Sequence, residues 1–366
     1  MGRTIVAVFS GTGNAQRAAG IVSAELQASG RVVEMVDLAA GADARARAGA
    51  TIPELGPGDL LVLCSSTLGF SPPATVMGAL KAAPRSDSAG SDGAQVAMLC
   101  VCGGIMNKGR ISGGWSGAAS IVSLGVLARK GWEPVGSADA SYPQNWTQMS
   151  EAAMGADQTA IIERGDAETR AFGQAVAAGQ RIFLKRNALT LSVGRFVGFI
   201  FRLVASKILG SMYIADDTCT SCGLCARVCP ARAIVMRNGA PSWTLRCIDC
   251  NRCINACPTA SIQTSTARLI IFTAINVVAM FGSPPLARSI LHAAAPGLSG
   301  PVFGFVSFLT GVALYAAITM LQLGPLARLT VSLERKPVFR RFFTASFTRR
   351  YQRYLAPGFK PSGSNH

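Results

Sequence analysis

The chain has 366 residues, of which 49% are hydrophobic and 15% are charged, and its mean hydropathy is +0.34. Soluble domains usually carry about 25% charged residues, so a purely soluble protein is not expected. The length predicts roughly two or three domains, and the near absence of low-complexity sequence excludes a disordered chain. Charge is divided unevenly: residues 1–180 have a net charge of −2, and residues 181–366 have +18. The basic half suits nucleic acid, anionic lipid or an acidic protein partner.

Short apolar runs alternate with helical segments in the first half of the chain, which predicts a parallel sheet covered by helices on both faces. The first run, residues 4–9, is followed by Ser-Gly-Thr-Gly-Asn at 10–14 and by a predicted helix at 15–28. Further strands are predicted at 31–36, 59–64, 95–101 and 132–136, and further helices at 72–82, 117–130 and 158–186.

Residues 187–211 are apolar but contain Arg195, Arg202 and Lys207. Three charges in so short a run argue against a membrane-spanning helix and favour an amphipathic linker helix. Two interpretations remain open: the helix packs against the protein, or it lies in a membrane interface.

Two long uncharged stretches follow the cysteine-rich region. Residues 269–287 lack charge, and residues 289–327 contain no Lys, Arg, Asp or Glu. Residues 302–323 supply the roughly 20 apolar positions that span a bilayer. The first stretch is a weaker candidate for a spanning helix, because it contains Asn276 and the pair Pro284-Pro285. The alternative, a pair of soluble core helices, lacks amphipathic partners to cover it. The sequence therefore predicts a two-helix transmembrane hairpin at 266–327.

The basic tail, residues 328–366, follows this hairpin. Residues 324–366 contain one acid, Glu334, and nine basic residues: Arg328, Arg335, Lys336, Arg340, Arg341, Arg349, Arg350, Arg353 and Lys360. Basic flanks stay on the cytoplasmic side of a membrane. We therefore expect both termini at the cytoplasmic face of the inner membrane. Aromatic residues interleave with the arginines, but no nucleic-acid-binding fold surrounds them, so membrane lipid is the expected partner and nucleic acid is not.

Eight of the 11 cysteines form two copies of the run C-x2-C-x2-C-x3-C-P, from Cys219 to Pro230 and from Cys247 to Pro258. Without a secretory signal in the first ten residues, a reducing compartment is expected, where clustered cysteines indicate metal ligands. A zinc ribbon needs only four ligands and no third cysteine at this spacing. The run is typical of two [4Fe–4S] clusters, in which the fourth cysteine ligates the other cluster. The predicted ligands are Cys219, Cys222, Cys225 and Cys257 for cluster one, and Cys247, Cys250, Cys253 and Cys229 for cluster two.

The loop Ser10–Ala15 lies between a predicted strand and a predicted helix, where backbone N–H groups bind phosphate. A dinucleotide fingerprint is the alternative, because Gly11 and Gly13 are present and Asp37 ends the second strand. Gln16 occupies the place of the third glycine, so the hydroxyl-rich loop better suits the phosphate monoester of FMN.

Residues 1–150 resemble a flavodoxin, and residues 1–265 resemble the flavodoxin–ferredoxin fusion family. The resemblance rests on S-G-T-G-N-A at 10–15, on a turn at 65–73, on C-G-G at 102–104 after the fourth strand, and on Y-P-Q-N-W at 142–146. It implies a flavodoxin-like doubly wound parallel sheet and a small α+β two-cluster ferredoxin domain. The implied FMN-binding residues are Ser10, Thr12, Gly13, Asn14, Ala15, Thr67, Leu68, Gly69, Phe70, Gly103, Gly104, Asn145 and Trp146.

We therefore expect a flavodoxin-like domain at 1–186, the linker helix at 187–211 and the ferredoxin domain at 212–265, before the hairpin and tail. The expected function is membrane-anchored electron transfer between FMN, two [4Fe–4S] clusters and a redox protein partner, with no catalytic residues. Two alternatives remain: a reductase of a lipid-soluble substrate such as a quinone or unsaturated isoprenoid, and a redox-responsive regulatory module. Cys64 and Cys100 are expected to be buried thiols, and Cys102 would lie near the flavin.

Overall fold

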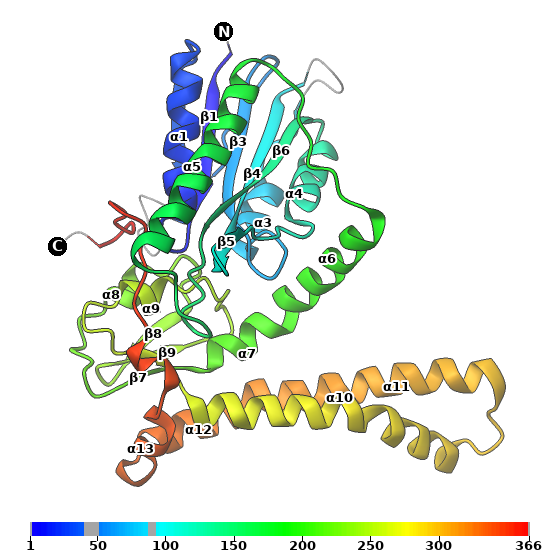
Figure 1. Ribbon diagram of the computed structural model, residues 1–366. Helices are drawn as coiled ribbons and strands as arrows, with labels where there is room; N and C mark the ends of the chain where they lie inside the picture. The colour runs from blue at the N-terminus through cyan, green and yellow to red at the C-terminus, as the bar shows by residue number, and fades with distance from the viewer. Residues whose placement is uncertain (1, 40–50, 87–92, 365–366) are drawn as a thin grey trace.

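The computed structural model describes residues 2–39, 51–86 and 93–364. Figure 1 shows an α/β domain, a small cysteine-rich domain against one end of its sheet, and a long helical hairpin that projects from the cysteine-rich end. The three parts follow the predicted order along the chain.

A parallel sheet forms the centre of the α/β domain. Its parallel strands lie in the order β2-β1-β3-β4-β6, and β5 pairs antiparallel with the end of β4. This is the strand order of flavodoxin-like sheets, whose ligand sites lie beyond the carboxyl ends of the strands. The strands are β1 (Thr4–Phe9), β2 (Val33–Asp37), β3 (Leu60–Ser66), β4 (Gln95–Asn107), β5 (Arg110–Ser112) and β6 (Glu133–Pro143).

Helices cover both faces of this sheet, as the alternating pattern predicts. On one face, α1 (Asn14–Ala28) and α5 (Gly155–Ala177) bury Val22, Leu26 and Phe172 against the strands. On the other face, α3 (Ala74–Ala82) and α4 (Ala119–Ala128) bury a second apolar layer. Strand β1 is buried throughout because it lies between these layers, which explains its continuous apolar run.

Strand β4 differs from the prediction. The expected turn at Cys102–Gly104 is wrong, because β4 continues to Asn107. Gly103 and Gly104 pair with Tyr142 and Pro143 of β6, and the strand then folds back on itself through β5. Ladder hydrogen bonds on both sides thus extend the strand through two glycines that, in isolation, indicate a turn.

The cysteine-rich domain contains two antiparallel strand pairs and two short helices. The pairs are β7 (Tyr213–Ala215) with β10 (Ile262–Thr264), and β8 (Ile234–Arg237) with β9 (Ala240–Trp243). The helices are α8 (Leu224–Arg227) and α9 (Arg252–Ala256). This gives the small α+β arrangement that the sequence predicts.

The linker is one continuous helix, made of α6 (Ala188–Ile200), a π-helical turn (Phe201–Ala205) and α7 (Ser206–Ser211). Gly194 and Gly198 lie against Ala118 and Ser71 of the α/β domain. The opposite face exposes Leu189, Val193, Phe196, Phe199 and Leu203. The helix therefore packs on the protein along one side and leaves an apolar stripe on the other.

The hairpin consists of α10 (Thr266–Ala294) and α11 (Gly300–Leu321), which continues through a π-helical turn (Gln322–Leu326) into α12 (Ala327–Glu334). Pro284 and Pro285 lie inside α10 rather than at its end, so the first helix is longer than the stretch 269–287. Three helices in the described residues are long and apolar enough to cross a membrane: Ala188–Ser211, Thr266–Ala294 and Gly300–Glu334. The linker helix is therefore long and apolar enough to cross a membrane, although it contains charged residues.

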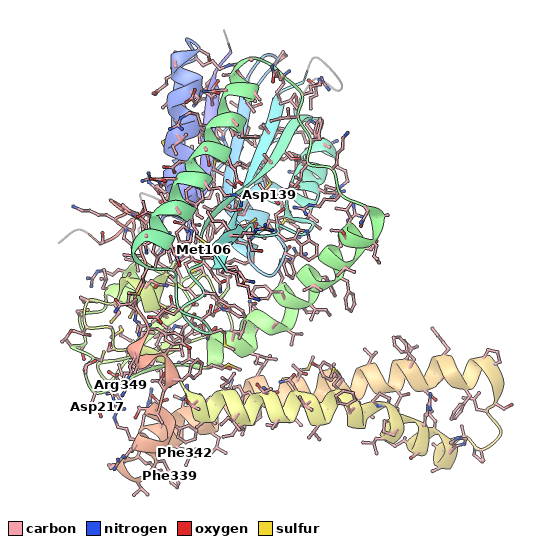
Figure 2. The ribbon with its side chains drawn as sticks, in the orientation of Figure 1. Met106, Asp139, Asp217, Phe339, Phe342 and Arg349 are labelled. Atoms are coloured by element: carbon pink, nitrogen blue, oxygen red, sulfur yellow. The ribbon has the colours of Figure 1, made fainter. Side chains whose placement is uncertain are left out.

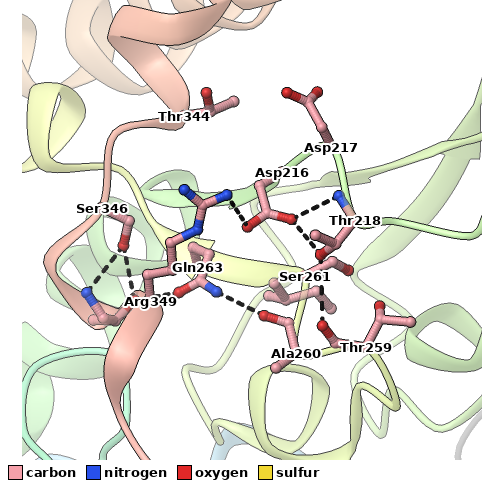
Figure 3. Close-up of polar contacts among 12 residues, drawn as sticks. Asp216, Asp217, Thr218, Thr259, Ala260, Ser261, Gln263, Thr344, Ser346 and Arg349 are labelled. Atoms are coloured by element: carbon pink, nitrogen blue, oxygen red, sulfur yellow. Dashed lines mark hydrogen bonds and ion pairs between the residues drawn. The ribbon is translucent and has the colours of Figure 1, made fainter.

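The tail runs back across the cysteine-rich domain. After α13 (Pro337–Thr344) and a short 3-10 helix (Phe347–Arg350), it reaches the α/β domain. In Figure 3, Arg349 forms an ion pair of 3.5 Å with Asp216, whose carboxylate also accepts hydrogen bonds from Thr218. Arg340 pairs with Asp217 at 2.5 Å. Part of the basic charge expected at a lipid surface therefore binds the neighbouring domain.

Candidate functional site

The eight clustered cysteines line two separate small cavities. One is bordered by Cys219, Cys222, Cys225 and Cys257, and the other by Cys229, Cys247, Cys250 and Cys253. The structure thus brings together the same two groups of four that the doubled motif predicts, with the last cysteine of each run placed in the other group. The chemistry of four thiols around a small cavity fits a cubane cluster.

Local backbone geometry explains how each run forms a tight loop. Ser221 and Gly223 have φ values of 59° and 70°, and Asp249 and Asn251, at the equivalent positions, both have 57°. These left-handed positions are tolerated best by Gly, Asn and Asp. They turn the chain before α8 and α9, which carry the third cysteine of each run.

The second cavity is the more buried of the two. Cys229, Cys247 and Cys253 are buried, whereas Cys222 in the first group is exposed. Burial, together with neighbouring thiols of the same group, raises the pKa of Cys225 to about 12 and that of Cys250 to about 11. No three Cys, His, Asp or Glu side chains in the described residues could hold a single metal ion. A cubane cluster does not require three side chains on one metal ion, because each thiolate binds a different iron.

Two aromatic side chains lie beside the second cavity. The rings of Tyr213 and Trp243 stack with centroids 5.5 Å apart, and both residues border the cavity. The Tyr213 hydroxyl donates a 3.0 Å hydrogen bond to Asp249, which also accepts one of 3.1 Å from the Trp146 indole. Burial raises the pKa of Asp249 to about 7. Trp146, expected at the flavin, therefore links the α/β domain to the second cluster loop.

Arg252 joins the second cluster loop to the predicted phosphate loop. Its guanidinium is 2% exposed and donates hydrogen bonds to four backbone carbonyls: those of Ser10, Gly11, Ala39 and Val228. All four acceptors are backbone carbonyls, and none is a carboxylate. Sequence reasoning missed Arg252, whose position between two predicted ligand cysteines was the only available signal.

Several donors expected to bind the phosphate donate to other groups of the protein. The N–H groups of Gly13 and Ala15 donate to the Ser10 hydroxyl at 2.9 and 3.2 Å. Asn145 donates to the Thr12 hydroxyl. Asn14 donates to the Pro143 carbonyl at 3.0 Å, so it joins the loop to β6 rather than pointing to a ligand.

The C-terminal tail covers the outside of the same loop. The Ala356 N–H donates to the Thr12 carbonyl at 2.8 Å. A Cβ on Gly13 would overlap Phe359 and Ala356, and one on Gly11 would overlap the Cys250 carbonyl. The loop from Ser10 to Asn14 is buried by protein. In this arrangement an FMN phosphate could reach the loop only if the tail moved away.

The predicted isoalloxazine loops are also covered. Phe201 of the linker helix lies against Gly69, and the Phe70 ring contacts the Trp115 ring at 4.4 Å. Leu68 pairs with Ser71 in a narrow turn, and Thr67 contacts Cys102 at 4.0 Å. Burial raises the pKa of Cys102 well above its ordinary value, so this thiol stays neutral.

Asp139 belongs to a partly buried ion pair next to these loops. It pairs with Arg186, which enters from the chain segment before α6 and lies 5.9 Å from the Trp115 ring. Figure 2 places Asp139 at the lower part of the sheet and Met106 nearer its cysteine-rich end. The pair fastens the linker segment over the predicted flavin region.

Comparisons with known proteins identify the cysteine-rich segment. Residues 218–262 match the family described as 4Fe-4S dicluster domain. The chain is a fusion of a flavodoxin-like sheet with a 4Fe-4S dicluster domain. The fusion is 36% identical over 67 residues to an uncharacterized ferredoxin of Methanocaldococcus jannaschii, and this match covers 17% of the fusion and 38% of that relative.

Solved flavodoxins align with the α/β domain of the fusion at low identity. A flavodoxin from the domain Archaea is 13% identical, with 47% of the fusion and 99% of that chain covered and a TM-score of 0.26. The Streptococcus pneumonia TIGR4 flavodoxin is 15% identical, with 48% and 97% covered and a TM-score of 0.26. The flavodoxin-like assignment rests on the strand order of the sheet.

Proposed function

We propose that the fusion is a membrane-anchored electron-transfer protein whose path runs through two [4Fe–4S] clusters. The observation that carries this proposal is the pair of cavities lined by four cysteines each. Cys219, Cys222, Cys225 and Cys257 would hold cluster one, and Cys247, Cys250, Cys253 and Cys229 would hold cluster two. Each cluster, when bound, takes up and releases one electron.

The protein distinguishes the two sites by burial. Cys222 is exposed, which favours exchange between cluster one and a soluble redox protein, whereas cluster two lies deep against the α/β domain. The Ala233 N–H donates to the Cys229 sulfur at 3.2 Å. Hydrogen bonds and solvent exposure tune cluster potentials. Arg227, Arg232 and Arg246 on the same domain favour an acidic partner.

The path through the clusters does not depend on FMN. The C-terminal tail covers the predicted phosphate loop, and the flavodoxin-like domain also serves as the scaffold that buries cluster two. FMN binding would require the tail to leave the loop.

The packing of the hairpin supports insertion into a membrane. Its helices contact each other through small residues, among them Ala279, Ser283 and Ala287 of α10 and Ser307 and Gly311 of α11. Large apolar side chains point outward, including Phe281, which is 69% exposed, and Phe308, which is 66% exposed. This distribution is inverted relative to a soluble helix pair and is typical of helices packed within lipid.

Asn276, Gln322 and Tyr315 form a hydrogen-bonded group inside the hairpin, whereas the buried hydroxyls of Ser283 and Ser307 have no hydrogen-bond partner among the described residues. Asn276 donates to Gln322 at 2.8 Å and accepts a 3.1 Å hydrogen bond from Tyr315. In lipid an unsatisfied polar group is costly, so such interhelical bonds stabilise a hairpin there. At its base, exposed Phe339 and Phe342 of α13 point away from the protein (Figure 2). Aromatic and basic residues are typical of the membrane–water interface, and the basic excess favours the cytoplasmic side for this base.

Anaerobic purification followed by iron and sulfide analysis tests the proposal. We expect about eight iron atoms per chain, as two cubanes require, and reversible one-electron reduction seen by electron paramagnetic resonance. Fewer than four iron atoms, or zinc in their place, would refute it. Extraction of membranes with alkaline carbonate tests the anchor, and release into the soluble fraction would refute that part.

A further inference from the structure

A cavity of about 440 Å³ lies where the hairpin meets the dicluster domain. Its walls come from β9 and the residues after it, from the end of the linker helix, and from α12 with the turn before it. Pockets for small organic ligands usually measure about 300–1,000 Å³. The cavity is therefore large enough for a ligand, and the two parts of the protein that form it are the electron-transfer domain and the membrane anchor.

The cavity shares a wall with the second cluster site. Tyr213 and Trp243 border both the large cavity and the cavity lined by Cys229, Cys247, Cys250 and Cys253. Their stacked rings thus form the partition between the two. A ligand in the large cavity would be one aromatic layer away from cluster two.

The lining combines apolar and cationic groups. Leu323, Ala327 and Val331 present an apolar surface on the hairpin side. Arg237 of β8 supplies N–H donors, and so does Lys207 of the linker helix, one of whose protons is already donated to the Cys247 carbonyl at 3.1 Å. Arg268, which is 2% exposed, is already held by Glu334 and by the Tyr213 carbonyl at 3.1 Å. The available donors suit a ligand with carbonyl acceptors on an apolar body.

We propose that this cavity binds the head group of a lipid-soluble quinone and that the quinone exchanges electrons with cluster two. The proposal rests on the proposed electron-transfer function and names its membrane substrate. Position favours this occupant, because a site at the base of the hairpin is reached from the bilayer. A phospholipid head group would account for the cations, but it gives no reason for the aromatic partition shared with a redox site.

The reaction balances with the groups named. Reduction of one quinone to its hydroquinone takes two electrons, one from each cluster, and two protons from water, which end on the two former carbonyl oxygens. A soluble one-electron donor protein of low potential returns both clusters to the reduced state. Lys207 and Arg237 would orient the carbonyl oxygens and would not be consumed.

Binding is tested first without turnover. The full chain, in lipid nanodiscs, is titrated with decylubiquinone while tryptophan fluorescence is recorded, and a photoreactive azidoquinone is cross-linked and mapped by mass spectrometry. The test variant is Ala327→Trp, which fills the cavity from α12. The matched control is Leu329→Trp on the same helix, at a side chain that is 53% exposed and outside the lining. We expect saturable quenching and cross-links to α12 or β9, with affinity at least tenfold weaker in Ala327→Trp and unchanged in Leu329→Trp.

Electron transfer is tested on the same samples after reduction with dithionite and removal of the excess. We expect decylubiquinone to reoxidise the clusters at least tenfold more slowly in Ala327→Trp than in the wild type, while ferricyanide reoxidises all variants equally. Equal quinone affinity in both variants, or labelling elsewhere, would overturn the proposal. Recovery of a bound phospholipid that quinone does not displace would also overturn it. If the clusters are absent or cannot be reduced, the proposed electron-transfer function is refuted. If ferricyanide reoxidises the clusters and quinone does not, only the quinone site is refuted.

Discussion

Tyr354 donates a 2.6 Å hydrogen bond to the side chain of Asn14, although 340 positions separate the two residues. Both side chains are buried. The bond fixes the C-terminal tail to the loop that, from its sequence, should hold a phosphate. The tail therefore belongs to the folded protein and closes a site that would otherwise be open.

Removal of the tail should open this loop. A chain that lacks residues 351–366 loses the Tyr354 hydrogen bond and the contact of Phe359 with Gly13. We expect it to bind FMN at least tenfold more tightly than the full chain, measured by quenching of FMN fluorescence. Lys360→Ala, at an exposed position of the same tail, should behave as the full chain does. Tight FMN binding by the full chain would contradict the idea that the tail closes the site.

Arg252 should matter for stability more than any exposed arginine of the same domain. Arg252→Met removes all four of its hydrogen bonds and leaves buried carbonyl groups without these donors. We expect a loss of about 2–4 kcal/mol in the free energy of unfolding, because hydrogen bonds to charged groups contribute about 1.5–3 kcal/mol each and are only partly replaced by water. Urea denaturation of the iron-loaded protein measures this loss. Arg246→Met, at an exposed side chain, should change stability by less than about 0.5 kcal/mol; an equal effect in both would show that the buried network is unimportant.

The sequence was sufficient for features that depend on local periodicity or spacing. The alternation of apolar runs and helices predicted the doubly wound sheet, and the spacing of Cys219 to Pro230 and its repeat predicted the dicluster domain, which the family match confirms. Both signals arise within short windows, so a single chain reveals them.

Features that depend on contacts between distant segments were not predictable. The turn at Cys102–Gly104 was expected because glycine favours turns, but pairing with β6 overrides this preference. The phosphate loop has suitable donors in sequence, but the Ser10 hydroxyl accepts from the Gly13 N–H, the Asn145 amide donates to the Thr12 hydroxyl, and the tail covers the loop. The contact of Phe201 with Gly69 similarly depends on where the linker helix lies. No local pattern carries this information.

Substitution of a ligand cysteine should lower the iron content of the protein, whereas substitution of another cysteine should not. Cys225→Ser removes one thiolate from the first group and should reduce iron from about eight to about four atoms per chain, because a cubane with three thiolates is easily lost. Cys102→Ser should leave iron unchanged, since burial keeps that thiol neutral and outside both cavities. Colorimetric iron analysis of anaerobically prepared protein gives the count. Loss of iron in Cys102→Ser would require a different ligand set.

Substitutions at outward-facing positions of the hairpin test whether lipid or water surrounds its helices. Val278 is 70% exposed, and in water Val278→Asp should change stability by less than about 0.5 kcal/mol, as surface substitutions usually do. At the centre of a spanning helix an aspartate disfavours insertion by about 2.5–3.5 kcal/mol. We therefore expect Val278→Asp and Phe308→Asp to reduce the carbonate-resistant fraction of the protein severalfold. Val338→Asp, at an 84% exposed side chain of α13 outside the hairpin, should not reduce it. Equal membrane retention of all three variants would show that the two helices pack in water, against another protein or a second copy of this chain.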